Sequence, residues 1–243
     1  MLSYNANMKS LRIKLIVFLL ILFVINLTTA FGWHDETHLA IAKVAGYSKW
    51  YNAVGPDIAK IKAGSTEPYN HYFDNNNKVE VTPEMVFSQI NKYNKPADKE
   101  GHLYGAIIAS LREYKKTVEA GKYPEYHIAF CAHYIGDLSQ PLHNISYDDF
   151  NKTHHVINDG IVENEVLKNI AYIEKNMYPI NLNPTHFEED LSREIARIAN
   201  LSRMLGHKLK TENIDITKEE AYVQLGHSAS LLRAILKYLG KID

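Results

Sequence analysis

Histidine and aspartate recur at helical spacing in the second half of this sequence. His133 and Asp137 are four residues apart, as are His155 and Asp159, so each pair would share one face of a helix. Such a pair can bind one metal ion, and the second oxygen of the carboxylate can bridge to another ion. His143 follows Asp137 by six residues and is a further candidate ligand.

The residue types favour a hydrolytic zinc site over a structural one. The chain has 12 histidines but one cysteine, and His38 and His71 are two more candidate ligands. Histidine and carboxylate ligands suit catalytic zinc, whereas structural zinc sites are rich in cysteine. Two or three zinc ions, the close pair on the order of 3.5–4 Å apart, would lower the pKa of a shared water to near neutrality and stabilise a departing oxygen. The chemistry expected from these residues is hydrolysis of a phosphate ester.

The segments that must position these side chains have the pattern of helices. Apolar residues follow helical spacing over 103–118, 191–205 and 221–239, and the segment 126–137 does the same. No comparable run of alternating apolar residues indicates a sheet. We therefore expect an all-α protein whose residues 33–243 form a single multi-helix domain.

Local signals mark where these helices begin and where the chain turns. The start signals are Thr82 followed by Pro83, and two pairs with capping-box spacing, Thr185 with Glu188 and Thr217 with Glu220. Breaks are expected over 64–77, around Pro96, over 121–124, over 144–153, and after Tyr178. Pro141 should kink or end the helix that carries His133.

The N-terminal segment has the layout of a secretory signal peptide. Lys9, Arg12 and Lys14 precede an apolar run over 15–27, and small residues follow. Cleavage after Gly32 predicts a signal peptide over 1–32; cleavage after Ala30 is the alternative. The apolar run is short for a membrane span of about 20 residues, which disfavours a retained anchor. The mature protein is expected to be secreted or periplasmic.

Charge and cysteine content narrow the classes further. The whole chain has 27 basic and 28 acidic residues, and three of the basic ones lie in the predicted signal peptide. The mature chain is therefore net acidic, which gives no support to a broad nucleic-acid-binding surface. Cys131 is the only cysteine, so an exported form has no internal disulfide.

The run from His133 to His143, HYIGDLSQPLH, closely resembles the signature of the zinc-dependent phospholipase C family. The same HxxxDxxQPxH block marks the related single-strand-specific zinc nucleases. In this superfamily the mature chain begins with a tryptophan whose free amine and carbonyl bind zinc, and Trp33 lies at the predicted cleavage point. The resemblance extends from Trp33 to about Glu163, and beyond it the helices match only in character.

The resemblance implies a trinuclear zinc site in a cleft. Trp33, His38 and Asp137 would bind the first ion. Glu67, His71, His133 and Asp137 would bind the second, and His143, His155 and Asp159 would bind the third. Asp137 would bridge the close pair and, with Glu67, would carry the catalytic role, while a metal-bridging hydroxide attacks phosphorus.

Glu67 is chosen because the segment before His71 departs from the family. The stretch from Gly64 to His71 is shortened, and the aspartate expected there falls on Tyr69. Glu67 lies in the matching block, four residues before His71. Two other carboxylates, Asp57 and Asp74, remain alternatives. Without a carboxylate at this metal, activity would be in doubt.

The signals for substrate class conflict. The interval between Trp33 and His38, and Asp159 in place of glutamate, resemble the nucleases. The segment from His155 to Glu163, the short chain and the missing nuclease insert resemble the phospholipases. Tyr72, Phe73 and Asp74 after His71 could contact a base or a lipid headgroup, or the two aromatic residues could belong to the core.

We therefore expect a phospholipase C-type hydrolase that acts on a phospholipid headgroup and contacts a membrane surface, with no stable protein partner implied. The alternative is a single-strand nuclease of the same superfamily, which acts on nucleic-acid phosphodiesters. A catalytically inactive zinc-binding module is the second alternative, and an anchored interaction protein would follow if the signal peptide were retained.

Overall fold

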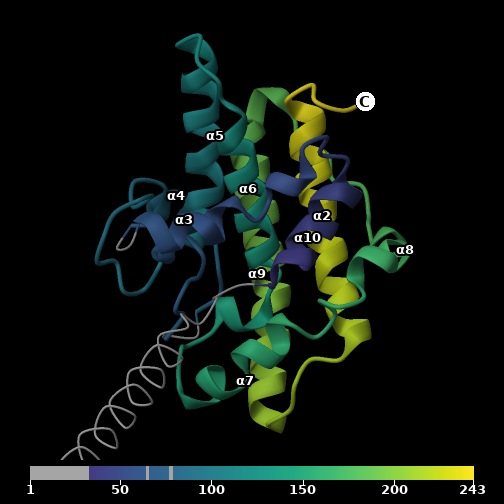
Figure 1. Cartoon of the computed structure of the whole chain (residues 1–243). Helices are drawn as coiled ribbons and strands as arrows, with labels where there is room; N and C mark the ends of the chain where they lie inside the picture. Colours follow the sequence, from purple (N-terminus) through teal and green to yellow (C-terminus); the bar gives the residue numbers. More distant parts are fainter. Residues whose placement is uncertain (1–32, 64–65, 77–78) are drawn as a thin grey trace, which may run out of the picture. The chain divides into compact units, whose positions relative to one another are not determined.

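The long helices α5 (Leu103–Glu119), α6 (Glu125–Leu138), α9 (Phe187–Glu212) and α10 (Lys218–Tyr238) run alongside one another and form the centre of the fold (Figure 1). A computed structural model describes residues 33–63, 66–76 and 79–243. These residues form helices and no strand, so the predicted all-α class is confirmed for them. They belong to one compact unit. The predicted signal peptide over 1–32 lies outside the described residues.

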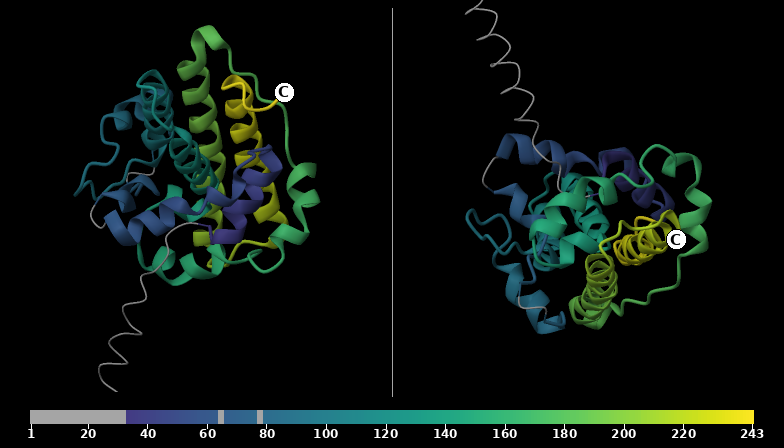
Figure 2. Two further views of the ribbon diagram at one scale, coloured as in Figure 1. Left: turned by 45° about the horizontal axis from the view of Figure 1, so that its top comes forward. Right: turned by 90° about the horizontal axis from the view of Figure 1, so that it is seen from below.

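Shorter helices surround this group. They are α2 (Asp35–Ala45), α3 (Gly55–Ala63), α4 (Pro83–Ile90), α7 (Asp149–Asp159) and α8 (Ile170–Lys175), with short 3₁₀ turns η1 (Trp50–Asn52), η2 (Glu67–Asn70), η3 (Pro141–Asn144), η4 (Val166–Lys168) and η5 (Pro184–His186). Helix α2 packs on α10, and α4 packs on α5 and α9. Figure 2 shows α9 and α10 side by side in both views.

Helix α6 is packed on several sides. It contacts α5, α10, α3, α2 and α9, and Tyr134, Ile135 and Leu138 are fully buried on it. Burial of each large apolar side chain contributes about 1.5–3 kcal/mol relative to exposure. Because the helix is fixed from so many directions, the polar side chains that it carries are also held in fixed positions.

Two of the three predicted helix starts are confirmed. The Thr82 side chain accepts a hydrogen bond from Met85 N at 3.3 Å, and Thr217 forms a reciprocal capping box with Glu220. The capping box predicted for Thr185 and Glu188 is wrong. Thr185 lies inside η5, where its amide donates to the Asn183 side chain, and Glu188 instead forms an ion pair with Arg112.

The predicted break over 144–153 is too long. Helix α7 begins at Asp149, because the Asp148 side chain accepts a hydrogen bond from Asn151 N and caps the helix. The break at Pro141 is confirmed, since α6 ends at Leu138 and η3 follows. None of the helices in the described ranges has the length and apolar character needed to cross a membrane.

Candidate metal centre

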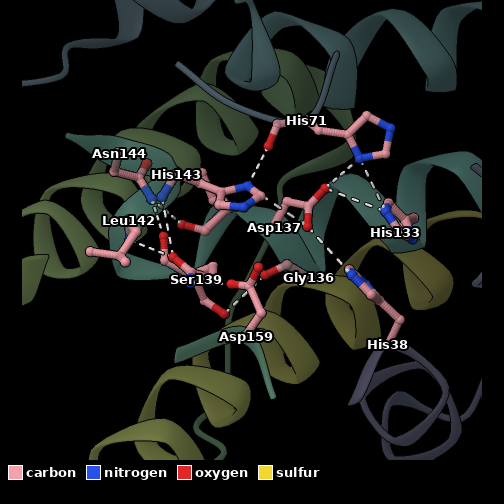
Figure 3. A network of polar contacts seen from close by, with 12 residues as sticks. His38, His71, His133, Gly136, Asp137, Ser139, Leu142, His143, Asn144 and Asp159 are labelled. Carbon is pink, nitrogen blue, oxygen red and sulfur yellow. Dashed lines mark hydrogen bonds and ion pairs between the residues drawn. The ribbon is translucent and has the colours of Figure 1, made fainter. Parts of the chain in front are cut away.

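Asp137 lies at the centre of a buried group of histidines (Figure 3). Its Oδ2 is 2.9 Å from Nδ1 of His71 and 3.4 Å from Nε2 of His133. Its Oδ1 is 3.4 Å from Nε2 of His38. The two oxygens thus face different imidazoles, which is the arrangement that a carboxylate bridging two metal ions requires.

Helix α3 brings a second carboxylate to the same group. Asp57 Oδ1 lies 3.6 Å from Nε2 of His133, and Asp57, His71 and His133 each offer a ligand atom within 4.8 Å of the others. Glu67 instead lies on the far side of His71, where its Oε1 is 3.3 Å from Nε2. Asp74 accepts a hydrogen bond from Tyr147 N and is not in this group.

A further group forms between η3 and α7. Nε2 of His143 is 3.2 Å from Nε2 of His155, which is 3.3 Å from Oδ2 of Asp159. All three side chains are buried, and their ligand atoms lie within 4.8 Å of one another. His143 also links the two regions, because its Nδ1 lies 3.9 Å from Oδ1 of Asp137. The structure therefore brings together eight of the ten side chains singled out in the sequence or left as alternatives for this site, and leaves out Glu67 and Asp74. The eight are His38, Asp57, His71, His133, Asp137, His143, His155 and Asp159.

Three of the histidines are anchored through Nδ1, while their Nε2 lies among the candidate ligands. Nδ1 of His133 lies 2.8 Å from the Ala53 carbonyl, and Nδ1 of His143 lies 2.5 Å from the His71 carbonyl. Nδ1 of His155 lies 2.6 Å from Oδ1 of Asn151. Such partners fix the tautomer, so Nε2 is left without a proton and can bind metal.

Gln140 connects the end of α6 to the third group of candidate ligands, which consists of His143, His155 and Asp159. Its Oε1 accepts hydrogen bonds from the backbone N–H groups of Leu142 and His143, and its Nε2 donates to Oδ1 of Asp159 at 2.5 Å. One side chain therefore shapes η3 and orients a candidate ligand. The motif contains this glutamine, but the sequence assigned no role to it or to Asn151. The latter lies four residues before His155, a spacing that could have indicated the contact.

Gly136 lets His38 approach α6. The His38 ring stacks on that of His133 with centroids 3.7 Å apart, and a Cβ atom at position 136 would lie 2.4 Å from Nδ1 of His38. No real contact is that short, so any larger residue must displace the ring.

If the group around Asp137 holds metal, Gly136→Ala should lower the zinc content of the zinc-loaded protein by about one ion per chain, because it displaces His38. Alanine favours a helix by about 1 kcal/mol over glycine, so α6 itself should persist. Elemental analysis of the purified protein and a thermal melt followed by circular dichroism would measure both effects. Gly55→Ala is a matched control because a Cβ there meets nothing within 4 Å. Full zinc content in the Gly136 variant would contradict the role of His38.

Burial controls the protonation of these groups. It lowers the pKa of His38 and His133 to about 4 and that of His155 to about 3, and it holds the pKa of His71 and His143 well below the usual range. The imidazoles are therefore neutral, which is the form that binds metal.

The carboxylates respond differently. Burial raises the pKa of Asp137 to about 8, because an ionised carboxylate in this position lacks water. Burial alone would also raise the pKa of Asp57, but the neighbouring His133 and the Lys60 ammonium, 2.6 Å from Oδ1, outweigh it and the pKa is lowered. A bound divalent cation would stabilise both ionised carboxylates.

The donor set fits zinc. Neutral imidazoles and carboxylates are its usual ligands in hydrolytic sites. Moreover, Oδ1 of Asp137 and both ring nitrogens of His38 are buried and make no hydrogen bond within the described part of the chain. Buried polar atoms without partners are costly, and a metal ion between them would satisfy them.

Trp33 and His34, the first described residues, lie beside the group that contains Asp159. Trp33 is buried, with 1% of its surface exposed, and the backbone N–H of the next residue, His34, donates to the carbonyl of Asp159 at 3.3 Å. His34 thus precedes α2 in the sequence, but in space its backbone lies beside Asp159, the last residue of α7.

A cavity of about 160 Å³ adjoins His155. Tyr72, Tyr147, Asp74 and Lys99 are among the residues that line it. Phe73 does not, since its ring packs against that of Tyr104 in the core with centroids 5.3 Å apart. Of the two aromatic residues after His71, one therefore faces the cavity and the other is a core residue.

No protein-family model matches this chain, and neither a curated protein nor a solved structure does so. Any assignment of function therefore depends on the geometry described above and on the resemblance of the sequence motif.

Proposed function

We propose that this chain is a zinc-dependent phosphodiester hydrolase of the phospholipase C type, in the superfamily that its HxxxDxxQPxH block resembles. The observation that carries the proposal is the position of Asp137. One buried carboxylate faces His38 through one oxygen and His71 and His133 through the other. This arrangement would set two metal ions at a short separation.

The proposed site holds three zinc ions. Their ligands would be Trp33, His38 and Asp137; Asp57, His71, His133 and Asp137; and His143, His155 and Asp159. Asp57 replaces Glu67 in this set because its carboxylate lies beside His133, in the group that also contains His71. When bound, zinc lowers the pKa of a coordinated water to about 7 and stabilises the charge of a departing oxygen.

The cavity beside His155 suits a headgroup. The rings of Tyr72 and Tyr147 line it together with the Asp74 carboxylate. Aromatic faces attract quaternary ammonium groups, and a nearby carboxylate adds to that attraction. Tyr72, Tyr147 and Asp74 therefore favour the ammonium group of a choline phospholipid, and Lys99 on the same cavity suits its phosphate. The same rings could also stack on a base, so the single-strand nuclease is the second candidate function.

Parallel assays of the purified protein test this proposal. The substrates are phosphatidylcholine vesicles and single-stranded DNA, each with zinc and after chelation. Zinc-dependent release of phosphocholine supports the phospholipase, and release of nucleotides supports the nuclease. A protein that contains zinc but releases neither product would be the inactive zinc-binding module.

We also propose that export creates the mature enzyme. If a signal peptide over 1–32 is removed, the amine of Trp33 becomes free to bind zinc. N-terminal sequencing of the exported protein should then begin at Trp33. A form that retains one additional residue before Trp33 should lose most of its activity. Unchanged specific activity in that form would contradict the ligand role of the amine.

A further inference from the structure

Glu67 is a buried carboxylate that the proposed ligand set does not use. It lies on η2 with 3% of its surface exposed. The Tyr134 hydroxyl donates to its Oε1 at 2.6 Å, and Nδ2 of Asn70 donates to its Oε2 at 3.1 Å. Both oxygens therefore already accept hydrogen bonds from protein groups.

The orientation of His71 explains why a carboxylate is placed there. Nδ1 of His71 faces the centre, 2.9 Å from Asp137 Oδ2 and 3.2 Å from His133 Nε2. Nδ1 is thus the atom that would bind zinc, and Nε2 must carry the proton. That Nε2 is fully buried and lies 3.3 Å from Oε1 of Glu67. The contact is longer and less well aligned than a good hydrogen bond, as is common before a site has bound its ligand.

We propose that Glu67 is a positioning residue for the zinc site: it accepts the Nε2 proton of His71 and so holds Nδ1 toward the metal. This inference rests on the proposed function. His71 is anchored in the opposite sense to His133, His143 and His155, which bind through Nε2 and are held at Nδ1. In each case an acceptor behind the ring fixes the tautomer and increases the basicity of the ligand nitrogen.

A chain of hydrogen bonds holds Glu67 in place. Asn70, which donates to Glu67 through Nδ2, has its Oδ1 2.8 Å from Nε2 of His102. Nδ1 of His102 in turn lies 3.0 Å from Oδ2 of Asp98, near the surface. The carboxylate behind His71 is therefore fixed by residues of η2, α6 and the segment before α5.

The geometry disfavours a direct bond from Glu67 to zinc. An ion between Glu67 and Nε2 of His71 would lie on the opposite side of the imidazole from Asp137 and His133. It would therefore not belong to the group that contains Asp57. The sequence-based prediction that Glu67 is a ligand and a catalytic residue is replaced here by a role that acts through His71.

The test compares zinc binding by the wild type, Glu67→Gln and Asp57→Asn. Zinc affinity is measured by competition with a chromophoric chelator, and metal geometry by the visible spectrum of the Co²⁺-substituted protein. We expect Glu67→Gln to lower the affinity for one of the zinc ions by about 10- to 100-fold. It should still bind as many ions as the wild type at saturation, with an unchanged Co²⁺ band pattern. Asp57→Asn, which removes a ligand, should alter that pattern.

Glu119→Gln is the matched control, because it makes the same change at an exposed carboxylate at the end of α5 and should leave zinc affinity within about twofold of the wild type. Wild-type zinc affinity in Glu67→Gln would overturn the inference. So would loss of one ion at saturating zinc with an altered Co²⁺ spectrum, since Glu67 would then be a ligand itself. A wild type that binds no zinc would overturn the proposed function, and this inference with it. Circular dichroism melts of the metal-free variants separate these results from misfolding.

Discussion

Asp137→Asn is expected to abolish the close pair of zinc ions and to lower phosphodiester turnover by at least about a thousandfold. Asparagine keeps the size of the side chain but cannot offer two anionic oxygens to two ions. Losing the charge stabilisation that such a pair supplies costs several kcal/mol in the transition state, and each 1.36 kcal/mol is a factor of ten in rate. Elemental analysis and the phosphocholine assay measure both effects.

Without metal, the same substitution should not lower the stability of the fold. Burial already raises the pKa of Asp137 to about 8, so an ionised carboxylate there destabilises the metal-free fold. With chelator at pH 8, Asp137→Asn should therefore be at least as stable as the wild type. Asp149→Asn is the control for turnover, because it makes the same change at a fully exposed carboxylate of α7 and should leave turnover unchanged. Full zinc content with normal turnover in Asp137→Asn would rule out the bridging role.

The metal-free protein should be most stable near pH 7. In the folded state five imidazoles, those of His38, His71, His133, His143 and His155, have pKa values lowered by burial. The unfolded chain binds more protons at these groups, so stability rises with pH up to their ordinary value near 6.5. The carboxylates act in the reverse sense. Burial raises the pKa of Asp137 to about 8 and that of Glu67 to about 7, so their contribution falls as pH increases from about 4 to about 8.

At pH 6.5 the imidazoles of the unfolded chain are still half protonated, so their contribution continues to rise above that pH while the contribution of the carboxylates falls. In the presence of chelator we therefore expect a clear rise in stability from pH 5 to pH 6.5 and a net change below about 1 kcal/mol from pH 6.5 to pH 8. With zinc, stability should instead rise through pH 8, because zinc replaces the protons on the buried carboxylates. Urea unfolding at pH 5, 6.5 and 8, with chelator and with zinc, measures the profile. A steady rise in stability through pH 8 without metal would contradict it.

The sequence predicted the long helices because their signals are local. The apolar spacing over 103–118 and 221–239 corresponds to α5 and α10, and the Thr217 capping box sits at the start of α10. The capping signal at Thr185 failed because Asn183 and Pro184 form a 3₁₀ turn first. Asn183 caps the backbone here in place of Thr185, and the spacing of residues in the sequence could not show which of the two would do so.

The candidate ligands on α6 and α7 were also accessible from spacing, since residues four apart on a helix share a face. Glu67 and His71 have the same separation but span a 3₁₀ turn and the residue after it, where that rule does not hold. Which nitrogen of His71 faces Asp137 depends on the packing of η2 against α6 and α3, which no local pattern records. Asp57 comes from a different helix, and its place beside His133 is a product of tertiary structure.

His71 contacts two of the groups of candidate ligands at once. Its ring faces Asp137 and His133, while its backbone carbonyl accepts the Nδ1 proton of His143 at 2.5 Å. An ion bound to the His71 ring would fix the backbone of His71. The His71 carbonyl would then hold His143 in the orientation that binds the neighbouring ion. Occupancy of the close pair should therefore raise the affinity of the third position. Zinc binding to the apoprotein should therefore be cooperative. Partly loaded molecules should be scarce at intermediate zinc concentrations.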